Sequence, residues 1–356
     1  MDDANPGPSD RPHWYRPGLE VQEEVLHNSG TNTLELAAAE QLPAFITDLR
    51  WIGVQANKLH AALANAGLRP CVRLALKAQR EPETLRYIRK LELGESKAKV
   101  GIDACSPDEV DSALESGWEA QEISCTGTNM SDSDLQRVID RGVHLNLDLL
   151  SQLERFGRLA PGSRAGIRIN PRSGAAWGGR RSLYTGVKPT KFGIYEEQLD
   201  DATELARRHD IQLDIVHMHV ADGFLNNDLP DIEQAVTVAS RVTKKLKSEG
   251  FPIREVNTGG GVGIRLRDDD PDLDLDEWAG ILKRHLGPLD VTVSTEPGNF
   301  LTKQSTLALA EIVTVEDRLG ERFIGLNVGW NVLSFQFLYD VPFTIVPCKR
   351  PLAPTV

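Results

Sequence analysis

Short apolar segments alternate with amphipathic segments from about residue 45 onward. The apolar segments are rich in Val, Ile and Leu, as is typical of strands buried on both faces. They predict strands at residues 72–76, 99–104, 122–126, 143–147, 165–170, 213–220, 253–258 and 291–295. Between them, apolar residues recur at helical spacing. This spacing predicts helices at residues 83–91, 107–116, 131–141, 196–208, 232–248 and 275–285.

The eight predicted strand–helix units match the number in a closed (β/α)8 barrel. An open doubly wound sheet also alternates, but it usually has fewer strands and a glycine-rich turn after its first strand. Here the glycine-rich turn at residues 259–261 follows the seventh strand. The pattern therefore favours an α/β fold whose main domain is a (β/α)8 TIM barrel over residues 41–304.

Residues 1–40 and 305–356 do not follow the barrel pattern. The C-terminal region predicts strands at residues 307–315, 323–328, 335–339 and 343–346. A complete sheet core needs more strands than these. We therefore expect residues 305–356 to begin a β domain that is either very small or incomplete. Residues 1–40 are expected to be an N-terminal segment of the same domain.

The composition narrows the possible partners. Of the 356 residues, 40% are hydrophobic and 26% are charged, and the net charge is -12. This excess of negative charge disfavours nucleic acid and anionic membrane surfaces. No apolar run approaches the roughly 18 residues that span a bilayer, and the acidic, Pro-rich start is unlike a signal peptide. We therefore expect a cytoplasmic protein.

The cysteines and the acidic segments give no sign of a metal site. Cys71, Cys105, Cys125 and Cys348 are scattered, without a Cys-x-x-Cys pair, so we expect reduced thiols. The acidic run at residues 268–277 lacks the glycine and the spacing of an EF-hand loop. No bound metal is expected.

Lys77 ends the first predicted strand of the barrel. Partial burial lowers the pKa of a lysine amine and enables it to form a Schiff base. Most lysines at strand ends instead extend the amine into water. Lys77 becomes a candidate catalytic residue only because of three later segments.

Two of these segments follow the seventh and eighth strands. Gly259, Gly260 and Gly261 allow several backbone N–H groups to approach one anion, and this part of a TIM barrel commonly binds phosphate. The alternative is a flexible turn. Glu296 ends the eighth strand, where it could keep a pyridine nitrogen protonated, or could merely cap the next turn.

The third segment ends the sixth strand. His217 and His219 lie on the same face of this strand. A metal would need a third ligand, and none occurs at a convincing spacing. One imidazole is therefore better suited to stack on a planar cofactor, and the other is expected to be a buried structural histidine.

The order of these motifs resembles that of the fold-type III pyridoxal-phosphate decarboxylases, over roughly residues 35–345. This family contains the diaminopimelate, ornithine, arginine and lysine decarboxylases. The resemblance implies a barrel of the alanine-racemase type, together with a partial β domain formed by the N- and C-terminal segments. It also implies pyridoxal 5'-phosphate as the cofactor, Lys77 as the Schiff-base lysine, and a homodimer with the active site at its interface.

The resemblance assigns roles to individual residues. Lys77, His219 and Glu296 would be catalytic, with His219 stacked on the pyridine ring and Glu296 paired with its nitrogen. Lys191-Phe192-Gly193 matches a short turn of the family. The cofactor-binding residues implied in this way are Lys77, Asp103, Ser106, Arg168, His219, Gly259, Gly260, Gly261 and Glu296.

Some positions depart from the family pattern. Asp222 stands where the family has a serine that contacts phosphate, and Asn299 stands where it has an arginine. The segment 327–331, which ends at Asn331, lacks the acid expected to bind a distal amine. Asp222, Asn299 and Asn331 are candidate substrate contacts. The cysteine, aspartate and tyrosine motifs of the family's C-terminal domain are not found before Val356.

We therefore expect PLP-dependent decarboxylation of an amino acid, either diaminopimelate-like or a specialised biosynthetic intermediate. The lack of a distal acid disfavours ornithine and lysine as substrates. An amino-acid racemase on the same fold is one alternative, although racemases of this fold place an arginine where this chain has Glu296. A non-catalytic, PLP-binding regulatory homologue is the other. Asp222 and Asn299 favour that alternative, and Lys77 disfavours it.

Overall fold

The computed structural model describes residues 14–16, 18–176, 189–267, 270–334 and 343–353. Contacts within the chain divide it into two compact units. The larger unit comprises residues 52–265 and 271–303, and the smaller comprises residues 1–51, 266–270 and 304–356. The smaller unit is therefore built mainly from the two ends of the chain.

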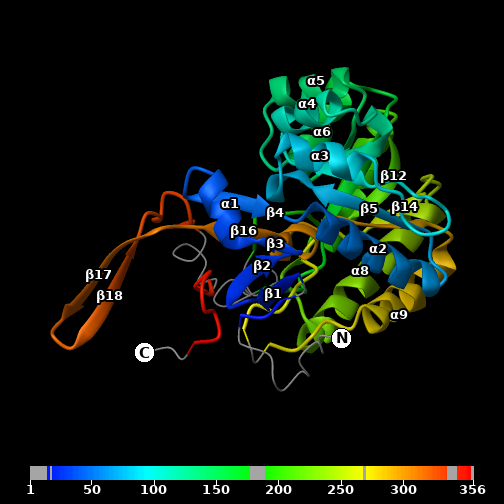
Figure 1. Ribbon diagram of the computed structural model, residues 1–356. Helices are drawn as coiled ribbons and strands as arrows, with labels where there is room; N and C mark the ends of the chain where they lie inside the picture. Colours follow the sequence, from blue (N-terminus) through cyan, green and yellow to red (C-terminus); the bar gives the residue numbers. More distant parts are fainter. Residues whose placement is uncertain (1–13, 17, 177–188, 268–269, 335–342, 354–356) are drawn as a thin grey trace. The chain divides into compact units, whose positions relative to one another are not determined.

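The larger unit is a closed barrel of eight parallel strands (Figure 1). Its strands are β5 (Pro70–Ala75), β6 (Gly101–Ala104), β7 (Ile123–Cys125), β8 (His144–Leu147), β9 (Arg164–Asn170), β12 (Gln212–His217), β14 (Glu255–Asn257) and β15 (Thr292–Thr295). Each strand pairs with the next, and β15 pairs with β5 to close the barrel. All eight predicted strands and the barrel fold are confirmed, with small shifts at the strand ends.

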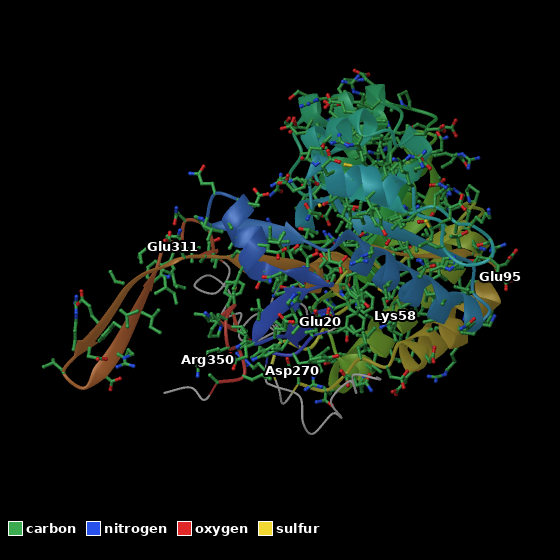
Figure 2. All side chains as sticks on the ribbon, viewed as in Figure 1. Glu20, Lys58, Glu95, Asp270, Glu311 and Arg350 are labelled. Atoms are coloured by element: carbon green, nitrogen blue, oxygen red, sulfur yellow. The ribbon has the colours of Figure 1, made fainter. Side chains whose placement is uncertain are left out.

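Helices surround the barrel because each buries one apolar face against the strands. They are α2 (Leu49–Asn65), α3 (Pro82–Arg89), α4 (Pro107–Glu115), α5 (Asp132–Asp140), α6 (Leu150–Leu159), α7 (Leu199–Arg208), α8 (Leu229–Ser248) and α9 (Leu275–Leu286). The predicted helices are confirmed, and α2 and α6 were not among them. Charged side chains such as Lys58 and Glu95 are exposed on the outer surface (Figure 2). Among the described helices, none combines the length and apolarity needed to cross a membrane.

The smaller unit contains short antiparallel sheets. Strands β1 (Leu19–Gln22), β2 (Val25–Asn28) and β3 (Thr31–Asn32) form one sheet, and helix α1 (Thr33–Ala39) follows them. Strand β4 (Ala44–Thr47) pairs with β16 (Thr306–Leu309), which joins the N-terminal and C-terminal parts of the unit. Strands β17 (Ile312–Arg318) and β18 (Glu321–Leu326) form a hairpin (Figure 1). The expected β domain from both chain ends is confirmed.

Details of the C-terminal strands differ from the prediction. The strand expected at residues 307–315 is interrupted and forms parts of β16 and β17. The strand expected at residues 343–346 is absent, and that segment has no regular structure in the described part of the chain. Pro342 and Pro347 flank it, and a proline has no N–H to donate to a sheet. The strand expected at residues 335–339 lies outside the described residues.

Candidate active site

The candidate residues gather at one mouth of the barrel. Lys77 lies in the turn η2 (Leu76–Ala78) directly after β5, and His219 follows β12. The three glycines follow β14, and Glu296 follows β15. The carboxyl ends of parallel barrel strands all open at the same mouth, which is where the active sites of this architecture lie. The structure therefore brings these residues together.

Glu296 is a buried carboxylate held by two side chains. Its Oε2 lies 3.1 Å from His217 Nε2, and its Oε1 accepts a hydrogen bond of 2.5 Å from Asn257 Nδ2. Burial alone would raise the pKa of Glu296, but the charge and hydrogen bond of His217 and the Asn257 bond lower it to about 2. Glu296 is therefore ionised. We did not predict these partners from the sequence, although both end strands beside the site.

His219 is a neutral imidazole, whereas His217 is the fully buried member of the pair. The Nδ1 of His219 accepts a hydrogen bond of 3.1 Å from the N–H of Gly260. Burial lowers the pKa of His219 well below its ordinary value, and the charges of Lys77 and Arg168 add to this effect. The His219 ring therefore carries no charge at neutral pH.

Lys77 differs electrostatically from the expectation. Its side chain is exposed as a whole, while its amine is surrounded by protein groups and lies 3.7 Å from Cys105 Sγ. Burial of the amine acts to lower its pKa, but Cys105 and the carboxyl groups of Asp103 and Glu296 raise it above its ordinary value. The expected lowering was wrong because a strand end in this barrel faces acids from other strands.

Asp103, in β6, is a second buried carboxyl group near Lys77. Burial raises the pKa of Asp103 well above its ordinary value, and the negative charge of Glu296 raises it further. Its Oδ1 has no hydrogen-bond partner among the described residues. An unpartnered buried oxygen is costly unless a ligand group or a proton occupies it. The neutral form of Asp103 is therefore favoured, whereas Glu296 is ionised.

The glycine loop is packed too closely for side chains. A Cβ on Gly259 would lie 2.3 Å from the Met218 carbonyl oxygen, and one on Gly261 would lie 2.3 Å from that of Ala221. Gly259 and Gly261 also have positive φ angles, of 71° and 86°. This loop has the close approach expected of an anion cradle.

Hydrogen bonding limits which amides of the loop face a ligand. Gly259 donates its N–H to Asn257 Oδ1 at 2.9 Å, and Gly260 donates to His219. The hydrogen bonds found within the described ranges leave the N–H groups of Gly261 and Val262 unused. An anion would therefore be held mainly by the second half of the loop.

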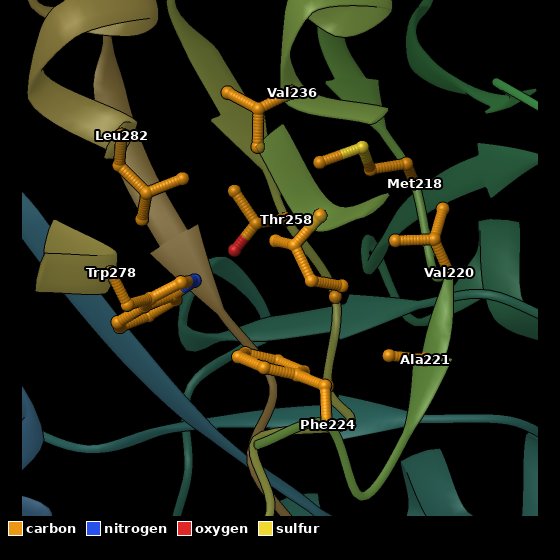
Figure 3. A pocket seen from close by; sticks show the side chains of 11 residues that line it. Met218, Val220, Ala221, Phe224, Val236, Thr258, Trp278 and Leu282 are labelled. Atoms are coloured by element: carbon orange, nitrogen blue, oxygen red, sulfur yellow. The ribbon is translucent and has the colours of Figure 1, made fainter. Parts of the chain in front are cut away.

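An apolar pocket lies behind the glycine loop (Figure 3). Met218 and Val220 line one side, and Trp278 and Leu282 of α9 line another. Its walls offer little hydrogen bonding, so the pocket is unsuited to a charged ligand. We interpret it as packing space that supports the loop.

Arg168, in β9, lies in a separate pocket together with Phe192 and His219. Its guanidinium carbon is 4.7 Å from the centre of the Phe192 ring, and its Nη1 is 3.5 Å from Asp148 Oδ2. The Lys191 amine lies 5.0 Å from the same ring. The predicted turn at residues 191–193 is thus attached to the strand that carries Arg168.

Ser106 and Asn299 lie at the starts of helices. Ser106 Oγ accepts the N–H of Glu109 at 3.3 Å and caps α4. Asn299 is half-buried at the start of α10 (Asn299–Thr302). Asn331 belongs to the smaller unit, where it is exposed. The structure therefore brings Ser106 and Asn299, but not Asn331, into the barrel unit.

Asp222 lies in β13 (Ala221–Asp222), directly before the segment that hydrogen-bonds to the glycine loop. Burial lowers the pKa of Lys303 to about 8, although the negative charge of Asp222 opposes this shift. We did not predict Lys303 from the sequence, since a lysine at a helix end is usually solvated.

No group of His, Cys, Asp and Glu side chains within the described ranges could hold a metal.

A family model described as "Pyridoxal-dependent decarboxylase, pyridoxal binding domain" matches residues 52–303. The chain belongs to this family. It is 29% identical over 347 residues to the diaminopimelate decarboxylase of Methanothermobacter thermautotrophicus, covering 94% of the chain and 78% of that protein. It is 28% identical to the Streptomyces coelicolor enzyme of the same name, covering 86% of the chain and 67% of that protein.

Solved structures share the fold. The diaminopimelate decarboxylase of M. jannaschii, in co-complex with L-lysine, matches with a TM-score of 0.83 at 21% identity, covering 94% of this chain and 78% of that one. The Helicobacter pylori enzyme, complexed with L-lysine, matches with a TM-score of 0.78 at 24% identity, covering 88% and 77%. This pyridoxal-dependent decarboxylase therefore has the fold, the cofactor and the reaction class that its motif order predicted.

The residues present fit pyridoxal phosphate. Lys77 offers a reachable amine, and Glu296 offers an ionised carboxylate at the same barrel mouth. The glycine loop offers the N–H groups of Gly261 and Val262, which no other group uses within the described residues, and Asp103 has an unpartnered buried oxygen near Lys77. These features suit an aldehyde, a pyridine nitrogen and a phosphate.

Proposed function

We propose that this decarboxylase acts on diaminopimelate or on a related amino acid with a polar group at its far end. Its relatives named above are diaminopimelate decarboxylases, and residues 327–331 contain no acid that would bind a distal amine. The observation that carries the site assignment is the ionised Glu296 at the same barrel mouth as the amine of Lys77. Substrate contacts are assigned to Asp222 and Asn299 of the barrel unit, and Asn331 of the smaller unit stays a separate prediction from the sequence.

We assign the cofactor to the barrel mouth. Lys77 would hold it covalently, Glu296 would pair with the pyridine nitrogen, and His219 would lie against the ring. The remaining residues assigned to the cofactor are Asp103, Ser106, Arg168, Gly259, Gly260 and Gly261. This assignment is supported by the shared location of these groups and by their complementary charges.

Bound pyridoxal phosphate supplies an electron sink for the electron pair that remains when the α-carboxylate leaves as CO2. The residues of this chain prepare that step. His217 and Asn257 keep Glu296 ionised and oriented, so that Glu296 can hold a proton on the pyridine nitrogen. His219 offers an uncharged face, and the pKa of the Asp103 carboxyl group near Lys77 is raised, which favours its neutral form.

A homodimer and a cytoplasmic location form part of the proposal. None of the four cysteines forms a disulfide, which supports a reducing compartment. We assign residues 41–304 to the cofactor-binding barrel, and residues 1–40 and 305–356 to the β domain. Sedimentation equilibrium should give twice the chain mass of 39.3 kDa, and a stable monomer would contradict the dimer.

The test begins with the purified protein and added pyridoxal phosphate. Binding at Lys77 should produce a visible absorbance band that borohydride abolishes, and peptide mass spectrometry should locate the reduced cofactor on Lys77. Lys77→Ala is the matched control and should show neither result. Reduced cofactor at another lysine would overturn the assignment.

Turnover is tested by CO2 release from diaminopimelate, lysine, ornithine and arginine, with chiral analysis of the products. Diaminopimelate should be the preferred substrate. Glu296→Gln should lower kcat by about 10²–10³-fold, since it removes a preorganised charge from the site. Racemised amino acid without CO2 would indicate the racemase, and full cofactor binding without turnover would indicate the regulatory homologue.

A further inference from the structure

Asp148 is a fully buried carboxylate that has no role in the proposed chemistry. It directly follows β8, and its exposed fraction is 0%. Its Oδ1 accepts the N–H of Gly193 at 2.6 Å, and its Oδ2 accepts the hydroxyl of Thr128. The same Oδ2 lies 3.5 Å from Nη1 of Arg168. The carboxylate after β8 therefore contacts segments of both neighbouring strands, β7 and β9.

The position of Asp148 is itself fixed. Its backbone N–H donates to Gln152 Oε1 at 2.7 Å, and Gln152 Nε2 donates to the Gly127 carbonyl at 2.9 Å. Gln152 is buried in α6, with an exposed fraction of 1%. Asp148 therefore cannot shift without breaking bonds that join α6 to the loop after β7.

The turn at residues 191–193 is held against β9 from a second side. Asn170 Nδ2 donates to the Phe192 carbonyl at 2.6 Å. Gly193 has a φ of 78°, and a Cβ there would lie 2.7 Å from the Ile169 carbonyl carbon. The guanidinium of Arg168 thus has the Phe192 ring at 4.7 Å and the Asp148 carboxylate at 3.5 Å.

This arrangement matters electrostatically because Arg168 is only 6% exposed. A buried cation without a partner costs several kcal/mol. Asp148 is the carboxylate paired with Arg168, whereas Glu296 is held by His217 and Asn257. Without Asp148, an Arg168 guanidinium turned toward solvent or toward another acid would have a lower free energy than one left in place.

We propose that Asp148 is a positioning residue of the active site, which holds Arg168 and the turn at residues 191–193 beside His219 and so sets the affinity for the cofactor. The proposal rests on the assigned role of Arg168 beside the cofactor. Arg168, Phe192 and His219 line one pocket, so a displaced guanidinium changes the wall of that pocket.

The experiment is a double-mutant cycle on the apoprotein, with the Kd for pyridoxal phosphate and the apoprotein Tm as readouts. Asp148→Asn keeps the side-chain shape and removes the charge, and Arg168→Met removes the cation. Each should raise the Kd about tenfold or more, because a small displacement of a positioning group costs that much. The double variant should bind no more weakly than Arg168→Met, since Asp148 acts through Arg168.

Asp214→Asn is the matched control. Asp214 is equally buried, at 0% exposure, and its Oδ2 accepts from Arg254 at 2.9 Å, but it lies toward the amino ends of the strands. It should lower the apoprotein Tm and leave the Kd unchanged. A purely structural role of Asp148 would make Asp148→Asn behave in the same way, which would overturn the proposal.

The outcomes separate the two proposals. If wild-type protein places no cofactor on Lys77, the proposed site is wrong. Suppose instead that Lys77 is labelled and Arg168→Met weakens cofactor binding. If Asp148→Asn then leaves binding unchanged, or if its effect simply adds to that of Arg168→Met in the double variant, only the role of Asp148 is wrong. If Asp148→Asn does not fold, the wild-type Arg168 guanidinium is observed by NMR instead. Separate Nη signals support a held guanidinium, and averaged signals contradict it.

Discussion

At the scale of single residues, two buried carboxyl groups near one lysine have pKa values shifted in opposite directions. Glu296 accepts hydrogen bonds from His217 and Asn257, which favour its ionised form. Asp103 has an unpartnered oxygen and lies near the charge of Glu296, so its neutral form is favoured. The ionised form is therefore favoured at Glu296, and the neutral form is favoured at Asp103.

The first prediction concerns acid stability. The pKa of Glu296 falls from 4.5 to about 2 on folding, so its ionised form adds stability above pH 4.5 that is lost as the pH falls through about 2. The free energy of unfolding of wild type, measured with urea, should therefore fall more steeply below pH 4.5 than that of Glu296→Gln. Asp103→Asn should have the opposite effect and stabilise the protein at pH 7, because the pKa of Asp103 is raised. Parallel pH profiles for wild type and Glu296→Gln would contradict this assignment.

The second prediction concerns Cys105. Burial raises the pKa of its thiol to about 12, and Asp103 adds to this effect. At pH 8 roughly one molecule in ten thousand then carries the reactive thiolate. Iodoacetamide should label Cys105 at least about 100-fold more slowly than it labels glutathione, as followed by mass spectrometry. Lys77→Met should slow labelling further, because Lys77 lowers this pKa. A wild-type rate equal to that of glutathione would contradict the raised pKa, and an unchanged rate in Lys77→Met would contradict the role of Lys77.

At the scale of elements, helix starts and tight loops place the functional groups. Ser106 caps α4 directly after the strand that carries Asp103, and the glycine loop follows the strand that carries Asn257. These connections are short, so a local change at a cap or a glycine is transmitted to the barrel mouth. The effect of such a position on stability can be separated from its effect on cofactor binding by comparing it with a cap or a glycine away from the barrel mouth.

The third prediction compares two helix caps. Ser106 caps α4 at the site, and Ser131 caps α5 with Asp134 in a capping box. Ser106→Ala and Ser131→Ala should each cost about 1 kcal/mol of stability, measured by urea unfolding. Only Ser106→Ala should also weaken cofactor binding. Equal Kd values for the two variants would limit Ser106 to its capping role.

The fourth prediction compares two glycines with similar backbone angles. Gly261 and Gly250 have φ values of 86° and 91°, but a Cβ meets the Ala221 carbonyl only at Gly261. Each alanine variant should be destabilised by about 1–3 kcal/mol of backbone strain. Gly261→Ala should in addition lose most cofactor affinity in an apoprotein titration. Retained affinity would show that the loop does not form the phosphate cradle.

At the scale of the whole molecule, polar groups inside the barrel connect strands that are not neighbours. Arg73 of β5 donates to Glu255 of β14 at 2.6 and 3.2 Å, and Ser294 of the intervening strand β15 donates to the same carboxylate at 2.6 Å. Both charged groups are buried. The closing strands of the barrel are therefore joined by side chains as well as by the backbone.

The fifth prediction follows from this pair. Arg73→Met removes the hydrogen-bonded cation of the buried Glu255 carboxylate and leaves only Arg254 at 3.8 Å, which should cost about 3–5 kcal/mol in urea unfolding. The double variant Arg73→Met with Glu255→Gln should recover part of this loss, because no buried charge remains. A single variant as stable as wild type would show that the pair does not stabilise the closed barrel.

Strand periodicity and the glycine, lysine and glutamate motifs were sufficient to predict the barrel and the residues at its mouth. Buried parallel strands produce continuous apolar runs, which are visible without coordinates. The missed partners, His217 for Glu296 and Lys303 near Asp222, come from strands and helices distant in sequence. No local pattern pairs such residues. The strand expected at residues 343–346 failed because apolar character alone does not supply a pairing partner.

The sequence by itself determined the α/β barrel, its cofactor class and the position of Lys77 at a strand end, because these depend on local periodicity and on the order of motifs. Only the tertiary structure decided the protonation states. The pKa of Lys77 is raised and that of Glu296 is lowered because acids, a thiol and an imidazole from other strands meet at one barrel mouth. Electrostatic interactions depend on distance in space and on burial, and neither is encoded at the position of a single residue.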